Sequence, residues 1–243
     1  MNSIRKIYNI LIKEFKEQGW WPISSLKNKE GIDENGYHHK SYYYPETDEQ
    51  IFEICVGAIL TQNTSWKNVE KAITNLKQNN SLSVNSILEL NQNKLAELIK
   101  SSGYHNQKAR KLKEFAKFYI KNKNNIHREE LLRVWGIGPE TADSILLYAF
   151  RKEYFVIDTY TKRIFLRIGL CSQKISYNEF QSLIQNSIKK DYKIYNEYHA
   201  LLVKLGKETC KTKPLCFKCL LKSTCSFSKN SKLLLKNSKN RKV

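Results

Sequence analysis

Apolar residues recur at intervals of three and four positions along most of the chain, which is the spacing of one face of an α-helix. One such run starts after Thr47, which together with Gln50 three residues later forms the capping-box pattern of a helix start. Strand-like alternation of apolar and polar residues is scarce. The pattern therefore predicts an all-α protein, with helices over residues 4–15, 47–60, 64–78, 83–90, 93–101, 107–121, 128–135, 139–151, 159–168, 177–189 and 194–208.

Two segments depart from this helical pattern. Residues 19–46 contain Trp20-Trp21-Pro22, three glycines and a tyrosine run that ends at Pro45, which are too many breakers for a helix. A loop of this length is usually functional or specific to a family. Lysine and asparagine dominate residues 226–243, and we expect a disordered basic arm there, above all over residues 229–243.

The composition narrows the choice of partner. The chain has 243 residues, with 42 Lys and Arg against 23 Asp and Glu, which gives a formal net charge of +19. Such a charge repels itself unless a polyanion neutralises it, so nucleic acid is the first candidate, although a coding bias toward lysine and asparagine also raises the charge. No apolar run reaches membrane-spanning length, and the first six residues run into charge instead of a signal-peptide core. We therefore expect a cytoplasmic, nucleoid-associated protein with no membrane partner.

The six cysteines divide into one cluster and two single residues. Disulfides are rare in a reducing compartment, so we expect the single residues Cys55 and Cys171 to belong to the core. Four thiolates close together in sequence bind either Zn²⁺ or a [4Fe–4S] cluster, and their spacing does not decide between the two. The candidate ligands are Cys210, Cys216, Cys219 and Cys225.

The segment Gly136-Ile137-Gly138 places a G-x-G turn between two predicted helices. Glycine permits a positive φ angle and leaves backbone amides accessible, and Pro139 suits the first turn of the helix that follows. The start of such a helix can bind a phosphate group. By itself, however, a G-x-G pattern is more often a plain tight turn.

Asp158 follows the apolar pair Val156-Ile157 and comes just before another predicted helix. By itself this pattern is typical of an N-cap, which stabilises a helix by about 1 kcal/mol. Its distance from the hairpin adds a second interpretation. The helix over residues 139–151 can run away from the hairpin, and the residues after it can return the chain to the hairpin end of that helix. A phosphate site and a carboxylate could then act on one nucleotide.

In this order, the G-x-G turn with Thr141 after it, Asp158 and the four cysteines resemble the hairpin, catalytic aspartate and cluster loop of the endonuclease III family. The resemblance covers roughly residues 47–225, although family members usually have one more residue between the first two cysteines. It implies that Asp158 is catalytic and that Gly136, Gly138 and Thr141 bind the DNA backbone. It also implies that the cysteines hold a [4Fe–4S] cluster, with Zn²⁺ as the alternative.

The same resemblance implies a helix-hairpin-helix glycosylase fold of two all-helical domains. A six-helix barrel would comprise residues 47–157, with the helix-hairpin-helix at about residues 128–151. Residues 158–228 would form a C-terminal helical domain that contains the cluster loop, and residues 1–46 would pack with it. Family members bind DNA between their domains, so we expect the chain to bind double-stranded DNA containing damaged bases. We also expect it to be a monomer.

Three segments resemble, more narrowly, the 3-methyladenine glycosylase III branch of the family: residues 19–22, residues 57–70 and the run Tyr104-x-Asn106-Gln107-Lys108-Ala109. This resemblance implies that Trp21, Pro22 and Trp66 line the pocket for the flipped base. It also implies that Gln62 and Tyr104 fill the gap left in the duplex. An alkylated purine is cationic, and an aromatic face attracts a cation by about 0.5 to 2 kcal/mol. The residue pattern alone favours a core role for the tryptophans.

Glu140 stands where the resemblance places the lysine of bifunctional family members, eighteen residues before Asp158. A carboxylate cannot form a Schiff base with the sugar. We therefore predict a monofunctional glycosylase that hydrolyses the N-glycosidic bond of alkylated purines such as 3-methyladenine. Two alternatives stay open: a bifunctional glycosylase and AP lyase for oxidised pyrimidines, which would use another lysine such as Lys162, and a non-catalytic DNA-binding module, against which Asp158 argues.

Overall fold

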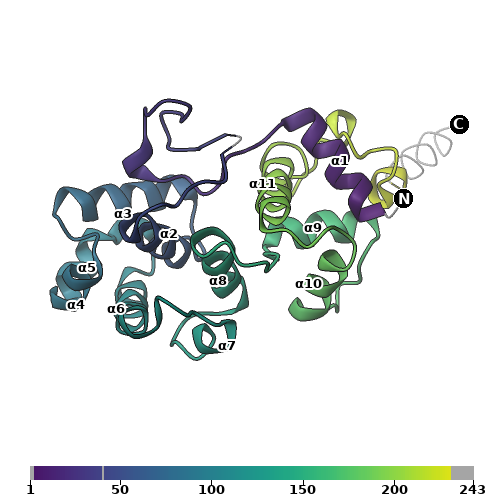
Figure 1. Cartoon of the computed structure of the whole chain (residues 1–243). Coiled ribbons are helices and arrows are strands. Elements are labelled where there is room, and N and C mark those ends of the chain that lie inside the picture. Colours follow the sequence, from purple (N-terminus) through teal and green to yellow (C-terminus); the bar gives the residue numbers. More distant parts are fainter. Residues whose placement is uncertain (1–2, 40, 231–243) are drawn as a thin grey trace, which may run out of the picture. The chain divides into compact units, whose positions relative to one another are not determined.

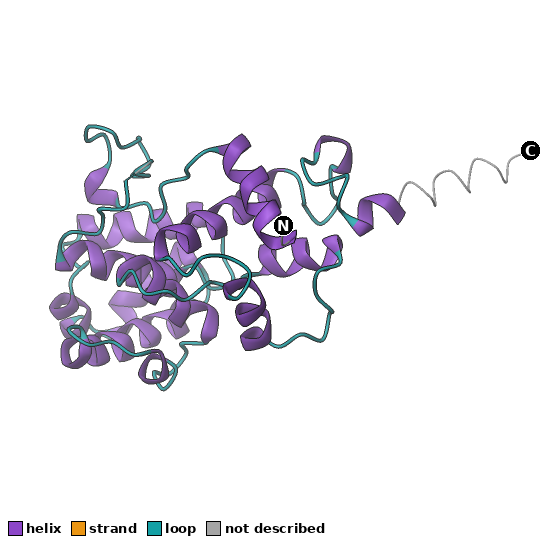
Figure 2. Ribbon diagram, turned by 45° about the vertical axis from the view of Figure 1, so that its right-hand side comes forward, coloured by secondary structure: helices purple, strands orange, loops and turns teal. Residues whose placement is uncertain are grey.

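The computed structural model describes residues 3–39 and 41–230 of the chain. All regular elements within these residues are helices, so the prediction of an all-α protein is confirmed (Figure 2). None of the helices there is long and apolar enough to cross a membrane. The described part of the expected basic arm, residues 226–230, is helical, and residues 231–243 lie outside the described part.

The chain divides into two compact units. One unit joins the N-terminal segment up to Gln18 with the chain from Phe155 onward, and the other runs from Gly19 to Tyr154. This division differs from the expected grouping of residues 1–46 with the C-terminal domain. Hydrogen bonds explain part of the difference, because the buried Glu53 carboxylate accepts from the backbone N–H and the hydroxyl of Ser24, at 2.6 and 2.8 Å.

The unit from Gly19 to Tyr154 is built around α2 (Asp48–Leu60), in which every residue from Phe52 to Leu60 is buried. Figure 1 shows α2 lying among α3, α6 and α8, and its contacts include these helices and η3. Cys55, at the centre of α2, is fully buried as expected. The helical elements around α2 are η1 (Ser24–Leu26), α3 (Trp66–Gln78), α4 (Val84–Glu89), α5 (Gln92–Leu98), η2 (Lys100–Ser102), α6 (His105–Asn122), α7 (Arg128–Leu131), α8 (Pro139–Ser144) and the π-helical η3 (Ile145–Ala149).

Residues 19–46 form a folded loop within the same unit. His38 is buried, and its ring nitrogens lie 2.7 Å from the Ser41 carbonyl and 3.1 Å from the Trp21 carbonyl. Burial lowers the pKa of His38 below its usual value, and the hydrogen bonds to the Ser41 and Trp21 carbonyls act against this shift. The backbone N–H of His38 also donates to the Gly19 carbonyl at 3.1 Å. These bonds fix the segment that carries Trp20 and Trp21.

The other unit contains α1 (Ser3–Phe15), α9 (Thr159–Ile168), α10 (Tyr177–Gln185), α11 (Tyr192–Glu208) and η4 (Cys216–Lys218). Helix α11 contacts both α1 and α9. The Tyr198 hydroxyl donates to the Ile4 carbonyl at 2.9 Å, and the Phe155 ring packs edge-on against Tyr195 and Tyr198 at 5.7 and 5.6 Å. Cys171, expected in the core, is only partly buried in the loop after α9.

Capping side chains set several of the helix ends. The Thr47 hydroxyl accepts from the backbone N–H of Gln50, and Ser176 and Glu179 form a reciprocal capping box at the start of α10. Helix α9 has the predicted bounds, with Asp158 as its N-cap and Gly169 in the left-handed conformation at its end. Helices α7 and α10 end earlier than predicted, and the helix predicted over residues 139–151 is an α-helix followed by a π-helix.

Candidate functional site

The G-x-G turn connects α7 to α8. Gly138 is the N-cap of α8 and Pro139 is its first residue, as the sequence predicts. Gly136 has a φ angle of +83°, and a Cβ atom there would lie 2.6 Å from carbons of the Lys111 side chain. A residue other than glycine would therefore be strained at position 136. The turn brings the Lys111 side chain of α6 directly against the hairpin.

Gln62, in the turn after α2, is bound to this hairpin. Its side-chain N–H groups donate to the Gly136 carbonyl at 3.1 Å and to the Thr141 hydroxyl at 2.9 Å. Its carbonyl oxygen accepts a hydrogen bond from Lys111 Nζ. The structure thus brings together three residues assigned to DNA binding from the sequence. In this arrangement Gln62 would have to leave its partners before it could enter a duplex.

Tyr104 occupies a different setting. It is the N-cap of α6, and both Gly103 and Tyr104 have positive φ angles, +69° and +46°. The Tyr104 side chain is 67% exposed, among the most exposed large hydrophobic side chains that the structure describes. A positive φ at a non-glycine residue costs free energy, so the turn holds the ring outward against a local preference. This position suits a side chain that inserts between bases.

The tryptophans assigned to the base pocket form an aromatic cluster beside α2. The Trp21 ring centroid lies 5.1 Å from that of Trp66, edge to face, and 5.0 Å from that of Tyr148. A Cβ atom at Gly57 would lie 3.1 Å from Trp21 Nε1, so the small residue lets the indole approach the helix. Trp20 completes the cluster, with its ring centroid 5.9 Å from that of Trp21 and 6.0 Å from that of Tyr148.

Burial differs within this cluster. Trp21 is 7% exposed and Pro22 is buried, whereas Trp66 keeps an intermediate exposure. The Trp66 Nε1 atom is buried and has no hydrogen-bond partner in the described part of the chain. Trp21 is therefore already packed as a core residue, and Trp66 is the ring of the pair with free surface. The sequence indicated no role for Tyr148, which lies in the π-helix η3, where a 3.6-residue period does not apply.

Asp158 lies in the unit that contains α9. Its side chain is the N-cap of α9, with Oδ1 accepting from the Thr161 backbone N–H at 2.7 Å. The residue is 8% exposed. Burial raises the pKa of Asp158, but interactions with His199 and Thr161 outweigh burial and leave the pKa below its usual value. Asp158 is therefore a buried carboxylate that is ionised at neutral pH.

His199 is the residue that sequence analysis missed next to Asp158. It comes from α11, is 4% exposed, and its Nε2 lies 3.7 Å from Asp158 Oδ2. The same helix carries Lys207. Burial lowers the pKa of Lys207 below its usual value, and the charge of Asp158 offsets part of this shift. Two basic side chains of α11 thus act on one carboxylate. The packing of α11 against α9 creates this arrangement, and no local motif indicates it.

A known protein family matches the part of the chain that contains the hairpin and Asp158. The profile described as "HhH-GPD superfamily base excision DNA repair protein" matches residues 56–190, more than half of the chain, and this span includes both the hairpin and Asp158. The chain belongs to this superfamily of base excision repair glycosylases.

Several known proteins resemble the glycosylase over most of its length. A protein of Methanocaldococcus jannaschii, provisionally named a DNA repair glycosylase, is 42% identical over 234 residues, covering 91% of this chain and 95% of the relative. Endonuclease III of Sulfolobus acidocaldarius is 29% identical over 195 residues, covering 77% of this chain and 86% of the relative.

Solved structures share the fold. The 3-methyladenine DNA glycosylase of H. pylori, bound to 1,N6-ethenoadenine, has a TM-score of 0.65 at 27% identity, covering 86% of this chain and 98% of that chain. A non-covalent complex of endonuclease III with DNA has a TM-score of 0.73 at 21% identity, covering 94% of this chain and 96% of that one. At 21% identity the second likeness shows the fold alone.

The four cysteines of the glycosylase follow α11 and are not paired in disulfides. Burial raises the pKa of Cys216, and the thiolate charges of Cys225 and Cys210 raise it further, so these side chains are electrostatic neighbours. Arg167 ties down the loop, with hydrogen bonds to the carbonyls of residues 211 and 212 at 2.6 and 2.8 Å. Within residues 3–39 and 41–230, no group of three or more His, Cys, Asp or Glu side chains is arranged to hold a metal ion. The donor chemistry therefore suits a metal centre, and the side-chain geometry does not form one.

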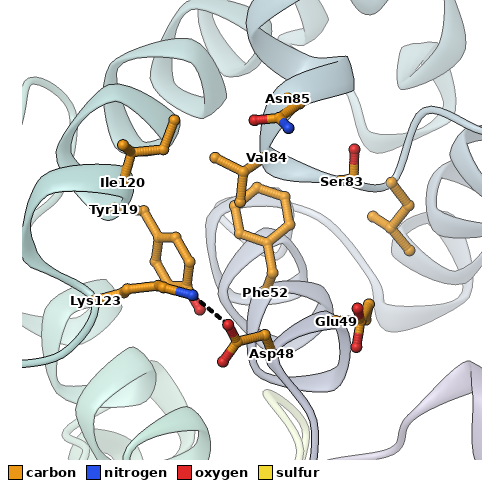
Figure 3. Close-up of a pocket in the computed structure, with 10 residues that line it drawn as sticks. Asp48, Glu49, Phe52, Ser83, Val84, Asn85, Tyr119, Ile120 and Lys123 are labelled. Carbon is orange, nitrogen blue, oxygen red and sulfur yellow. Dashed lines mark hydrogen bonds and ion pairs between the residues drawn. The ribbon is translucent and has the colours of Figure 1, made fainter.

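A pocket of about 300 Å³ lies at the other end of α2 from Gln62. Figure 3 shows its lining, in which Phe52, Val84 and Tyr119 supply apolar surface and an ion pair joins Lys123 to Asp48. The pocket contains none of the residues assigned to the base, the duplex or the metal.

Proposed function

We propose that this glycosylase excises alkylated purines such as 3-methyladenine from double-stranded DNA by hydrolysis of the N-glycosidic bond. The aromatic cluster of Trp21, Trp66 and Tyr148 carries the proposal. Within this cluster Trp66 has free surface, and its electron-rich face would attract a cationic base by about 0.5 to 2 kcal/mol beyond ordinary stacking. Trp66 would stack on the flipped base, with Trp21 and Pro22 behind it. An alkylated purine is already a good leaving group, so the site needs no acid to protonate it.

Asp158 would supply the catalytic charge. It is buried, ionised and held by the Thr161 N–H at 2.7 Å, so little reorganisation is needed to place its negative charge. A fixed carboxylate can stabilise the oxocarbenium-like sugar as the base departs, and it can orient or deprotonate the attacking water. His199 would keep Asp158 ionised despite its burial.

Hairpin residues would hold the DNA backbone. Gly136 and Gly138 lie at the turn before α8, and Thr141 lies in the first turn of α8, where backbone amides at a helix start can bind phosphate oxygens. Tyr104 would enter the duplex where the base has left, and Gln62 would line the same gap from the hairpin side. The net charge of +19 supports binding to a polyanion.

Glu140 supports a monofunctional enzyme. It occupies the first turn of α8, where the endonuclease III resemblance places a lysine, and a carboxylate there cannot attack the sugar as an amine would.

One observation favours a lyase instead, because Lys207 lies close enough to Asp158 for the two charges to interact. Borohydride separates the alternatives, since it traps a Schiff base between enzyme and DNA. We expect no trapped product; trapping that is lost in Lys207→Met would show a lyase.

We further propose that Cys210, Cys216, Cys219 and Cys225 hold a [4Fe–4S] cluster, with Zn²⁺ as the alternative. Four thiolates on a loop held by Arg167 are a suitable donor set for either group. Such a centre would be structural, shaping a loop whose lysines can contact phosphates: Lys211, Lys213, Lys218 and Lys222. No step of the base excision depends on it. We also propose that the enzyme acts as a monomer in the cytoplasm, in association with the nucleoid.

The decisive experiment is base release from defined substrates. The purified full chain is incubated with methylated duplex DNA, and the freed bases are separated and identified. We expect 3-methyladenine to be released, with the abasic strand left uncut until alkali is added. Release of oxidised pyrimidines with strand cleavage, and no release of methylated purines, would overturn the proposal. Binding to DNA without release of any base would leave only a DNA-binding module.

A further inference from the structure

Lys108 is a lysine buried inside the unit that carries the hairpin. It lies in the first turn of α6 and is 2% exposed. Its Nζ donates to the Leu60 carbonyl at 2.8 Å and to the Ser102 carbonyl at 2.7 Å. Burial lowers the pKa of Lys108 to about 8, and the charge of Lys111 lowers it as well. Removing an ammonium group from water is costly, and an apolar side chain of the same length would avoid that cost. The cost of burying Lys108 therefore indicates that its two hydrogen bonds have a role.

The two acceptors of Lys108 lie just before the two residues assigned to the duplex gap. Leu60 is the last residue of α2, and Gln62 follows two positions later. Ser102 is the last residue of η2, and Tyr104 follows two positions later. A single ammonium group thus joins the ends of two segments that are far apart in sequence. Each acceptor is only two residues from Gln62 or Tyr104, so the two bonds fix the separation of the turns that carry these side chains.

Lys111, one turn further along α6, reinforces this arrangement. It donates to the Gln62 side chain and packs against Gly136 of the hairpin. The start of α6 is therefore linked to Gln62 through Lys111, and to the backbones preceding Gln62 and Tyr104 through Lys108. Without the Lys108 bonds, the turns that carry Gln62 and Tyr104 would lose their shared anchor.

We propose that Lys108 is a positioning residue that sets the spacing between Gln62 and Tyr104, and through it the efficiency with which the enzyme flips a base. The inference rests on the proposed function, since it assumes that these two side chains occupy the duplex gap. A buried Nζ cannot contact a phosphate group, so Lys108 contributes nothing directly to DNA binding. Loss of the Lys108 hydrogen bonds would act on the relative positions of Gln62 and Tyr104.

The test compares Lys108→Met with Lys113→Met in the full chain. Lys113 is a matched control, because it lies on the same helix and its Nζ also donates to a backbone carbonyl, that of Leu88, at 2.9 Å. Three quantities are measured: single-turnover release of 3-methyladenine, fluorescence of a 2-aminopurine placed beside the lesion as a reporter of flipping, and affinity for undamaged duplex. A displacement of about 1 Å can cost on the order of a hundredfold in rate, so we expect Lys108→Met to slow release at least about tenfold and to reduce the fluorescence change.

Affinity for undamaged duplex should stay within about twofold in Lys108→Met, because that binding rests on exposed phosphate contacts. Lys113→Met should change none of the three quantities by more than about twofold, because its bond joins α6 to Leu88 and not to the turns that carry Gln62 and Tyr104.

Unchanged release and fluorescence in Lys108→Met would overturn the inference. So would equal losses of release and of undamaged-duplex binding, which would indicate a general weakening of the fold. Lys108→Gln, which keeps two N–H donors, provides a second variant if the Met variant does not fold, and it should retain more activity.

A double-mutant cycle separates this inference from the proposed function. If Lys108 acts through Tyr104, then Lys108→Met should add little to the loss caused by Tyr104→Ala, because contacting or coupled residues are non-additive. Fully additive losses would refute the positioning role while leaving the function intact. If Tyr104→Ala itself has no effect on release, Tyr104 does not act in the duplex gap and the inference about Lys108 fails. If the native enzyme releases no methylated purine, the proposed function fails instead.

Discussion

Replacing Asp158 by asparagine tests the catalytic assignment with little disturbance to the fold. In the structure, Asp158 Oδ1 caps α9 through the Thr161 N–H at 2.7 Å, and an amide oxygen can accept the same bond. The other oxygen lies 3.7 Å from His199 Nε2, and an amide NH₂ group would take its place there. The change therefore keeps the shape and the cap and removes the negative charge.

The expected loss is large because the charge is buried. Asp158 is 8% exposed, and a fixed charge in such a setting stabilises a developing cation more than it would in water. Losing electrostatic help of this kind typically slows an enzyme on the order of 10² to 10³ fold or more. Binding to abasic DNA should be unchanged or slightly tighter, since a negative charge has been removed from a protein that binds phosphates.

The assay is the single-turnover rate of 3-methyladenine release from alkylated duplex. Native and Asp158→Asn proteins are compared at matched circular dichroism and at saturating enzyme, so that neither folding nor binding limits the rate. A variant that keeps most of its activity would show that Asp158 is only a helix cap. The catalytic role would then have to be assigned to another residue.

The same variant should alter the pH dependence of stability. The pKa of Asp158 is depressed in the folded state, so its carboxylate stabilises the fold at neutral pH, and this contribution is lost as the pH falls through the folded-state pKa. Native protein should therefore lose more thermal stability than Asp158→Asn between neutral pH and a pH below about 4, the usual pKa of an aspartate. Equal losses in the two proteins would contradict the depressed pKa.

Three further changes test other parts of the site. Trp66→Ala should weaken excision of cationic purines by about 1 to 3 kcal/mol while sparing binding to undamaged duplex, and equal losses in both assays would mark Trp66 as a core residue. Gly136→Ala should lower the free energy of unfolding by about 1 to 3 kcal/mol, measured in urea, because φ is positive there, whereas Gly138→Ala should cost less. Purified protein should be yellow-brown and contain iron and sulfide, and Cys216→Ala should lower its Tm; colourless protein with stoichiometric zinc would contradict the cluster.

The sequence by itself determined the features that depend on local physics. The bounds of α9 match the prediction, because Asp158 caps its start and Gly169 ends it in the left-handed conformation. The hairpin turn follows the same rule, with Gly138 and Pro139 at the start of α8. Such signals act within one helical turn, so a pattern of a few residues is enough to predict them. The order of hairpin, aspartate and cysteines was likewise enough to indicate the superfamily.

Only the tertiary structure decided which distant side chains meet. His199 lies beside Asp158 because α11 packs on α9, and Lys108 reaches Leu60 and Ser102 because α6 packs against the ends of α2 and η2. Tyr148 joins the tryptophans from a π-helix, whose period differs from the one used to predict the chain. The free energy comes from burial, and also from charge in the first case, hydrogen bonds in the second and ring packing in the third, all between segments far apart in sequence. A local pattern contains no information about such contacts, because they exist only after the helices have packed.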